Sequence, residues 1–193
     1  RLNRQYYNSL RKSNIAILDS GFLCILLMIF NLTIVRKFSG YLFLKKFLLS
    51  NYFKKKILSI DPDYKEAKLN KKLLKSFRIK SESYIAPIYK KNFIDLKLFS
   101  IIKKIKPTYI LINIAGEKQE ILAYEITKRF KKVSVICTGA AISFITKSQA
   151  PINDKIDRLY LGWFARLLSA PKVYYGRVLK SLMLVKFFLF KNK

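Results

Sequence analysis

Short apolar runs alternate along this chain with longer segments in which apolar residues recur at helical spacing. The short runs are typical of strands and comprise Ile15–Leu18, Ile57–Ile60, Ser83–Ala86, Tyr109–Ile114 and Val133–Cys137. The longer segments predict helices at Tyr41–Phe53, Tyr64–Phe77, Leu96–Ile105 and Gln119–Phe130. A strand and a helix together take roughly 25 residues, the length that parallel strands joined by crossover helices require.

The continuous apolar run Tyr109–Ile114 indicates a parallel sheet that is covered on both faces. We therefore predict an α/β fold with a doubly wound, mostly parallel, Rossmann-like sheet in residues 1–152. Residues 153–193 are helical in pattern, basic and aromatic, and are predicted to close the site and contact a membrane. Ligands of such sheets bind at the carboxyl ends of the strands. The loops Asp19–Gly21, Gly116–Glu120 and Thr138–Ala141 are therefore expected to meet at one crevice.

Charge and composition narrow the chemistry. The 193 residues carry 39 basic and 11 acidic side chains, a net charge of +28. This excess favours nucleic acid, anionic lipid headgroups or phosphorylated substrates as partners, although most single lysines are explained as a solvated surface. Histidine is absent, which excludes a Ser-His-Asp triad and a histidine-ligated metal and leaves a carboxylate, Lys, Tyr or Cys as general base. Cys24 and Cys137 lie in apolar runs and are expected to be reduced core residues.

The chain begins at Arg1 inside a helix-like run, so we expect a fragment that lacks an upstream strand. Its longest uncharged apolar run, Phe22–Val35, is too short to span a bilayer, which needs about 20 residues.

Asp19 and the Gln119-Glu120 pair each have two interpretations. Asp19 follows a predicted strand and precedes an apolar run, so it is either a helix N-cap or a carboxylate base in the crevice. Glu120 in a first helical turn is favourable against the helix dipole. Gln119 at the same place can bind a sugar hydroxyl or a phosphate beside the backbone donors of the helix N-terminus. Asp61-Pro62-Asp63 mimics a metal-binding Asp-x-Asp, but Pro62 at a helix start favours a cap and turn without metal.

The C-terminal segment also has two interpretations. Arg166, Lys172 and Arg177 could clamp a diphosphate, or they could form a solvated helix face. Trp163 is either a packing residue or an interfacial anchor. The helical pattern after Pro171 is that of a helix closing over the domain or of a basic amphipathic element on a bilayer surface.

Taken in order, these loops resemble the bacterial WecG/TagA/CpsF family of glycosyltransferases, which act in the assembly of wall teichoic acid, enterobacterial common antigen and related polymers. The resemblance covers nearly the whole chain. The matching pieces are Asp19–Gly21, Phe38–Tyr41 (a short strand ending in glycine before a helix), Gly116–Glu120, Thr138–Ala141, Ala150-Pro151, Trp163, Arg166, Pro171 and Arg177.

The resemblance implies an inverting transfer from a UDP-sugar without metal or cofactor. The donor would carry N-acetylmannosamine or its uronic acid, and the acceptor would be N-acetylglucosamine diphosphate on a polyprenol. Asp19 would deprotonate the acceptor hydroxyl, and Gln119 would hold the sugar. The other substrate-binding residues would be Glu120, Thr138, Gly139 and Ala140, together with Arg166, Lys172 and Arg177, which would neutralise the departing UDP. Such an enzyme would be cytoplasmic and peripheral on the anionic inner face of the plasma membrane; a homo-oligomer is left open.

The chain departs from the family pattern at a few positions. Glu117 stands where the family usually has proline, and Ser20 separates Asp19 from its glycine. Gly162 and Gly176 replace a common glutamate and a common arginine.

Two other functions are suggested by the charge and the fold class. A nucleic-acid-binding protein without catalytic activity is motivated by the charge, but no zinc finger, RNP-like motif or GXXG loop is present, and we expect no nucleic-acid partner. A dinucleotide-dependent oxidoreductase would need G-x-G-x-x-G after a strand, and the sequence has none.

Overall fold

Four parallel strands form the centre of the fold. They are β1 (Lys56–Asp61), β2 (Lys80–Ile85), β3 (Tyr109–Ile112) and β4 (Ser134–Cys137), arranged in the order β2-β1-β3-β4. This confirms the predicted α/β class with a parallel, Rossmann-like sheet. The chain runs from β1 to one side and then returns to the other, so the order reverses between β1 and β3. The carboxyl ends of these two strands are therefore the topological switch point of the sheet.

The computed structural model describes residues 3–30, 37–50, 56–90, 93–148, 156, 158–159, 161–169 and 171–191. In its last helices some residues, Arg166 and Arg177 among them, are described by their backbone alone. The chain divides into two compact units, of which the first comprises residues 1–16 and 43–149 and the second residues 17–42 and 150–193. The predicted functional division after residue 152 stays a prediction.

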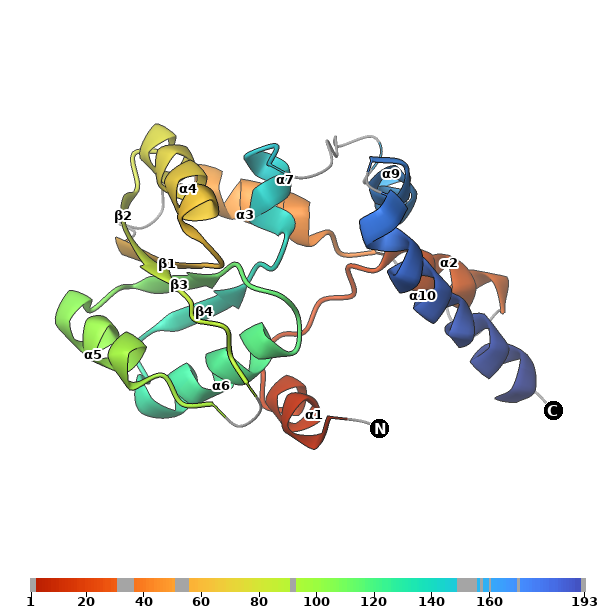
Figure 1. Ribbon diagram of the computed structural model, residues 1–193, viewed down its shortest axis with the longest axis horizontal. Helices are drawn as coiled ribbons and strands as arrows, with labels where there is room; N and C mark the ends of the chain where they lie inside the picture. Colours follow the sequence, from red (N-terminus) through yellow and green to blue (C-terminus); the bar gives the residue numbers. More distant parts are fainter. Residues whose placement is uncertain are drawn as a thin grey trace. The chain divides into compact units, whose positions relative to one another are not determined.

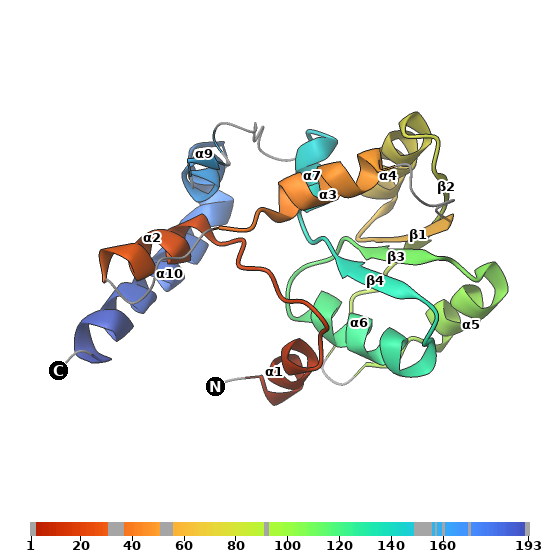
Figure 2. The same cartoon turned by 180° about the vertical axis from the view of Figure 1, so that it is seen from behind.

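Helices cover both faces of the sheet in the first unit. One face carries α4 (Tyr64–Ser76), α7 (Ala141–Ile145) and α3 (Gly40–Leu49), and the other carries α5 (Leu96–Ile105) and α6 (Lys118–Arg129) (Figures 1 and 2). Helix α1 (Arg4–Arg11) packs on α6. Helices α1, α4 and α5 begin where a side chain accepts from a free backbone N–H group of the first turn; Asp63 Oδ1, for example, accepts from the Glu66 N–H at 2.8 Å at the start of α4.

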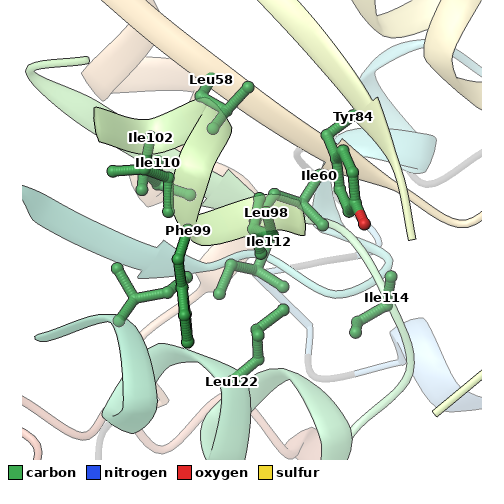
Figure 3. Close-up of a cluster of buried hydrophobic side chains, with 11 residues drawn as sticks. Leu58, Ile60, Tyr84, Leu98, Phe99, Ile102, Ile110, Ile112, Ile114 and Leu122 are labelled. Carbon is green, nitrogen blue, oxygen red and sulfur yellow. The ribbon is translucent and has the colours of Figure 1, made fainter. Parts of the chain in front are cut away.

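Each face of the sheet has its own apolar core, because successive strand residues point to opposite faces. Toward α5 and α6 the cluster consists of Leu58, Ile60, Tyr84, Leu98, Phe99, Ile102, Ile110, Ile112, Ile114, Leu122 and Ile126. Figure 3 shows Leu122 of α6 pointing toward Ile112 of β3. Toward α3, α4 and α7 the cluster consists of Leu44, Leu48, Ile57, Leu74, Leu111, Ala141 and Ile142. The two-sided burial explains why β3 is a continuous apolar run.

The connection between β2 and α5 is held by buried Asp95. Its Oδ1 accepts from the Leu98 N–H at 2.9 Å, which caps α5, and its Oδ2 accepts from the hydroxyls of Tyr84 and Tyr89, each at 2.8 Å. Burial, followed by the hydrogen bonds to Asp95, raises the pKa of both tyrosines, so that they remain hydrogen-bond donors.

The second unit is helical. It contains α2 (Gly21–Ile29), α9 (Gly162–Ser169) and α10 (Pro171–Lys191). The rings of Phe22 and Trp163 meet edge to face at a centroid distance of 5.4 Å and join α2 to α9, so Trp163 is a packing residue. None of the described helices is long and apolar enough to cross a membrane.

Several predictions of local structure were wrong. Ile15–Leu18 is not a strand: the side chains of Ile15 and Ile17 are 81% and 42% exposed, and a short apolar run becomes a strand only when a neighbouring strand pairs with it. Phe38 and Ser39, at the predicted short strand, have no strand pairing either, and α3 begins at Gly40. Cys24 is buried as predicted, whereas Cys137 at the end of edge strand β4 is exposed and is not a core residue.

Candidate functional site

Polar side chains gather at the switch point, on the α4 face of the sheet. Ser59 and Asp61 of β1 point to this face because they alternate with the apolar residues of the opposite face. Asn113 follows β3 and lies in register beside Asp61, since its backbone N–H donates to the Ile60 carbonyl at 2.9 Å. Asp61 and Asn113 are 0% and 7% exposed. A carboxyl group and an amide are therefore buried side by side where the fold class binds its ligands.

One oxygen of Asp61 collects the donors around it. Oδ1 accepts hydrogen bonds from Ser59 Oγ at 2.9 Å and from the Nδ2 atoms of Asn70 and Asn113, each at 2.7 Å. Among the described residues, Asp61 Oδ2 and Asn70 Oδ1 are buried acceptors without a partner. Burial raises the pKa of Asp61; the three hydrogen bonds oppose this effect, and the nearby carboxylate of Glu66 adds to it.

Asn113 links this carboxyl group to the loop after β4. Its Nδ2 also donates to Ser59 Oγ at 2.9 Å, and its Oδ1 accepts from the hydroxyl of Thr138. The same hydroxyl lies 3.0 Å from the Ile112 carbonyl oxygen. The loop that starts at Thr138 is thereby tied to the end of β3.

The same loop meets the start of α6. The Gly139 N–H donates to Gln119 Oε1 at 2.9 Å, and Gln119 Nε2 donates to Glu120 Oε1 at 2.9 Å. Gly139 has φ of 51°, which favours glycine, and a Cβ there would lie 3.5 Å from Gln119 Nε2. Ala140 ends the loop as the residue before α7. The structure thus brings together Gln119, Glu120, Thr138, Gly139 and Ala140, as predicted; their roles in binding stay predictions.

Helix α1 covers the first turn of α6. Asn3 Nδ2 donates to Glu117 Oε2 at 3.3 Å, and Tyr6 lies close to Glu120 and Glu117. Burial, followed by these two carboxylates, raises the pKa of Tyr6. Glu120 Oε2 is a further buried oxygen without a hydrogen-bond partner in the described part of the chain.

Asp19 belongs to the second unit, where the structure resolves one of its two interpretations. The N-cap of α2 is Ser20, whose Oγ accepts from the Leu23 N–H at 3.2 Å. Asp19 therefore does not cap this helix; it is exposed, and its Oδ2 lies 3.0 Å from the position of a Cβ at Gly40. A Cβ at Gly40 would therefore require this carboxylate to shift by a few tenths of an ångström.

The three basic residues also belong to the second unit. Lys172 directly follows Pro171 in the first turn of α10 and is exposed, and this turn has no acidic residue. The backbone of Arg166 lies in α9 and that of Arg177 in α10. Their convergence with Asp19 and Gln119 on one crevice stays a prediction.

The two aspartates of Asp61-Pro62-Asp63 have different structural roles. Asp63 caps α4, as predicted, whereas Asp61 is part of the buried polar cluster and does more than form a turn. Within the described ranges no group of three or more Cys, Asp or Glu side chains could hold a metal ion.

The comparison with known families bears on the whole chain. A sequence model described as the glycosyl transferase WecG/TagA/CpsF family matches residues 1–193. The chain belongs to this family. It is therefore an enzyme, a glycosyltransferase that takes a sugar donor and an acceptor, and the alternative of a nucleic-acid-binding protein without catalytic activity falls away. No curated protein matches the chain in sequence.

Sequence reasoning missed the buried polar residues of this glycosyltransferase. Ser59, Asp61 and Asn113 stand within or directly after apolar strands, at positions that alternate with buried apolar residues. That period of two was the available signal, because it places all three on one face of the sheet. Asn70 lies on α4 and gave no signal of its own.

The first prediction concerns Asp61→Asn, which keeps one oxygen acceptor and removes the titrating group. Because burial raises the pKa of Asp61, the stability associated with its neutral form is present below the ordinary pKa of about 3.9 and is lost as the pH rises through the folded-state pKa. The unfolding free energy of the wild type minus that of Asp61→Asn should therefore fall as the pH rises above the ordinary pKa of about 3.9. Urea unfolding at each pH measures it.

Asp63→Asn is the matched control for this series. It removes the same formal charge at the exposed cap of α4, where asparagine caps equally well. Its profile corrects for the loss of one carboxylate from a strongly basic chain. Parallel profiles for Asp61→Asn and the wild type after this correction would show that Asp61 titrates as an ordinary carboxyl group.

The second prediction concerns Glu117, whose φ of 67° proline cannot adopt. Glu117→Pro should destabilise the protein by about 3 kcal/mol, and Glu117→Gly should stabilise it by about 1 kcal/mol because glycine relieves the positive φ.

Glu82→Gly is the control. It changes an exposed glutamate of edge strand β2 and should instead destabilise the protein by about 0.5–1 kcal/mol. Thermal unfolding distinguishes the signs; equal stability of Glu117→Pro and wild type would contradict the strained conformation.

Proposed function

We propose that this glycosyltransferase transfers an N-acetylmannosamine-type sugar from a UDP-sugar to N-acetylglucosamine carried on a polyprenyl diphosphate. The products would enter a bacterial cell-surface polysaccharide or teichoic acid. The observation that carries the proposal is the joined pair of loops at the switch point, in which Gln119 Oε1 accepts from the Gly139 N–H. In an α/β sheet this is where a nucleotide-linked substrate is bound.

The start of α6 is suited to an anionic or hydroxyl-rich ligand. The side chain of Glu117 makes no cap hydrogen bond, so it does not occupy the first backbone N–H groups of the helix. The Gln119 N–H already donates to the Ala115 carbonyl at 3.3 Å, so the other N–H groups of this turn and the positive end of the helix dipole are what favour a phosphate or a sugar hydroxyl. Gln119 and Glu120 in this turn would bind the donor sugar, with Thr138, Gly139 and Ala140 forming the facing loop.

Asp19 would act as the general base. Its carboxylate takes the proton of the acceptor hydroxyl as that oxygen attacks the anomeric carbon, and the bond from this carbon to the diphosphate oxygen breaks. A single displacement inverts the anomeric configuration. The exposure of Asp19, which leaves it accessible to an acceptor, supports this role.

The charge on the departing UDP would be neutralised by Lys172, Arg166 and Arg177, without a divalent cation. Lys172 in the first turn of α10 adds its charge to the positive end of a helix that has no acidic residue there. Arginine is suited to bidentate contacts with phosphate oxygens.

The third prediction tests the reaction and the base. We expect the full-length chain to release UDP from one member of a panel of UDP-sugars when a short-chain lipid diphosphate of N-acetylglucosamine is present. Asp19→Asn should lower kcat by about 100-fold or more, because an amide cannot accept the proton. Asp63→Asn, at a helix cap in the first unit, is the charge-matched control and should retain activity. Full activity of Asp19→Asn would remove Asp19 as base, and a panel without turnover would contradict the proposed substrates.

Helix α10 would attach the enzyme peripherally to the anionic inner face of the plasma membrane. Exposed apolar residues recur along it at helical spacing, at Tyr175, Leu179, Leu182, Met183 and Leu189. Such a stripe, on a chain with a net charge of +28, is typical of a helix that lies in the membrane interface.

The fourth prediction is that the protein sediments with anionic vesicles and not with zwitterionic ones. Leu182→Glu should weaken this binding roughly tenfold, because an exposed leucine that would enter the membrane interface is replaced by a negative charge that anionic lipid repels. Leu96→Glu changes an exposed leucine of α5 and is the matched control. Equal sedimentation of both variants, or of a chain lacking residues 178–193, would contradict attachment through α10.

A further inference from the structure

A continuous chain of hydrogen bonds joins the ends of three strands at the switch point. It runs from Asp61 of β1 to Asn113 after β3 and on to Thr138 after β4. From Thr138 the backbone leads to Gly139, whose N–H is bound by Gln119 of α6. The first two members, Asp61 and Asn113, are too deeply buried to touch a ligand.

The donors and acceptors in this series of hydrogen bonds allow the amide of Asn113 only one orientation. Its two Nδ2 hydrogens are directed at two acceptors, Asp61 Oδ1 and Ser59 Oγ. Rotation of the amide by half a turn would place Oδ1 against the carboxyl oxygen and lose both bonds. Oδ1 must therefore face Thr138, whose single hydroxyl hydrogen it shares as an acceptor with the Ile112 carbonyl oxygen. The acceptor on Asp61 thus decides which atom Asn113 presents to the loop.

Thr138 transmits this orientation to the loop. A β-branched side chain has few rotamers, so a bonded hydroxyl fixes the backbone at residue 138 closely. The next residue, Gly139, has a positive φ of 51° and presents its N–H to Gln119 Oε1. Because this bond uses the carbonyl oxygen of Gln119, the amide nitrogen is left for another acceptor, and it donates to Glu120 Oε1 at 2.9 Å.

Packing alone does not require such a cluster. The two apolar clusters on either side of the sheet already bury β1 and β3, and buried polar groups stabilise a fold little compared with apolar residues of the same size. What the cluster adds is a unique orientation of Asn113, whose side-chain donors and acceptor are all hydrogen-bonded. Here that orientation ends at a loop which the proposed function assigns to donor binding.

We propose that Asp61 and Asn113 are positioning residues for the UDP-sugar, acting through Thr138 on the loop Gly139-Ala140 and on Gln119. The inference rests on the proposed function, since the loop has to bind the donor. It predicts that loss of the Thr138 hydroxyl weakens donor binding more than it affects the chemical step or the stability of the fold.

The test compares Thr138→Val with Thr138→Ser in the full-length chain. Valine keeps the branched shape and removes the hydroxyl, whereas serine keeps the hydroxyl. For Thr138→Val we expect the Kd for UDP and the KM for the UDP-sugar to rise about fivefold, as the loss of one hydrogen bond implies, with kcat changed less than twofold. Amide exchange in residues 138–140 should accelerate by a similar factor. Thr138→Ser should restore binding and exchange to within about twofold of the wild type.

Thr127→Val is the matched control. Its hydroxyl donates to the Tyr124 carbonyl of the same helix at 3.0 Å, so the substitution removes a comparable bond away from the loop. Its midpoint of thermal unfolding should match that of Thr138→Val, while its Kd for UDP should equal that of the wild type.

The outcomes separate the two proposals. If the wild type binds UDP and Thr138→Val binds it equally well with unchanged exchange, the positioning role is wrong and the proposed function stands. If Thr138→Val and Thr127→Val weaken UDP binding equally, the effect is one of general stability and the positioning role is again wrong. If the wild type binds neither UDP nor any UDP-sugar, the proposed donor is wrong, and with it the inference.

Discussion

The burial of β1 and β3 on both faces is the constraint on which the rest of the first unit depends. Ile57 and Leu111 face one helical layer while Leu58, Ile60, Ile110 and Ile112 face the other, so neither strand can shift by one residue without exposing apolar side chains. The register that results pairs Ile60 with Ile112 and carries the chain on to Asp61 and Asn113 as neighbours. An apolar requirement thus sets the alignment of the polar atoms at the strand ends.

At those ends the balance of forces changes. Asp61 Oδ1 is buried and accepts hydrogen bonds from three donors. The other carboxyl oxygen, Asp61 Oδ2, and the amide oxygen of Asn70 have no partner in the described part of the chain. Burial of such groups costs free energy that an apolar residue would not. The cluster stands at the topological switch point, where α/β folds bind their ligands, and the proposed positioning role would account for this cost.

The second unit follows a different logic. Residues 17–42 lie in the sequence between two parts of the first unit, yet they form a unit with residues 150–193. Within this unit α2 packs on α9 through Phe22 and Trp163. Asp19 and Gly40 come from the two ends of this inserted segment and lie in contact range. The proposed base and the basic residues of α9 and α10 therefore belong to one unit, and the loops proposed for the donor sugar belong to the other.

Local patterns were sufficient for most of the secondary structure. The sequence by itself determined β1, β3, α4 and α5, because periodicity and helix caps depend on residues a few positions apart. It failed at Ile15–Leu18, since a strand exists only where another strand pairs with it. Only the tertiary structure decided that Asp61, Asn113 and Thr138 form one chain of hydrogen bonds, across separations of 52 and 25 positions. The physical reason is that strand register brings them together, and register is set by the packing of both faces of the sheet and not by any local pattern.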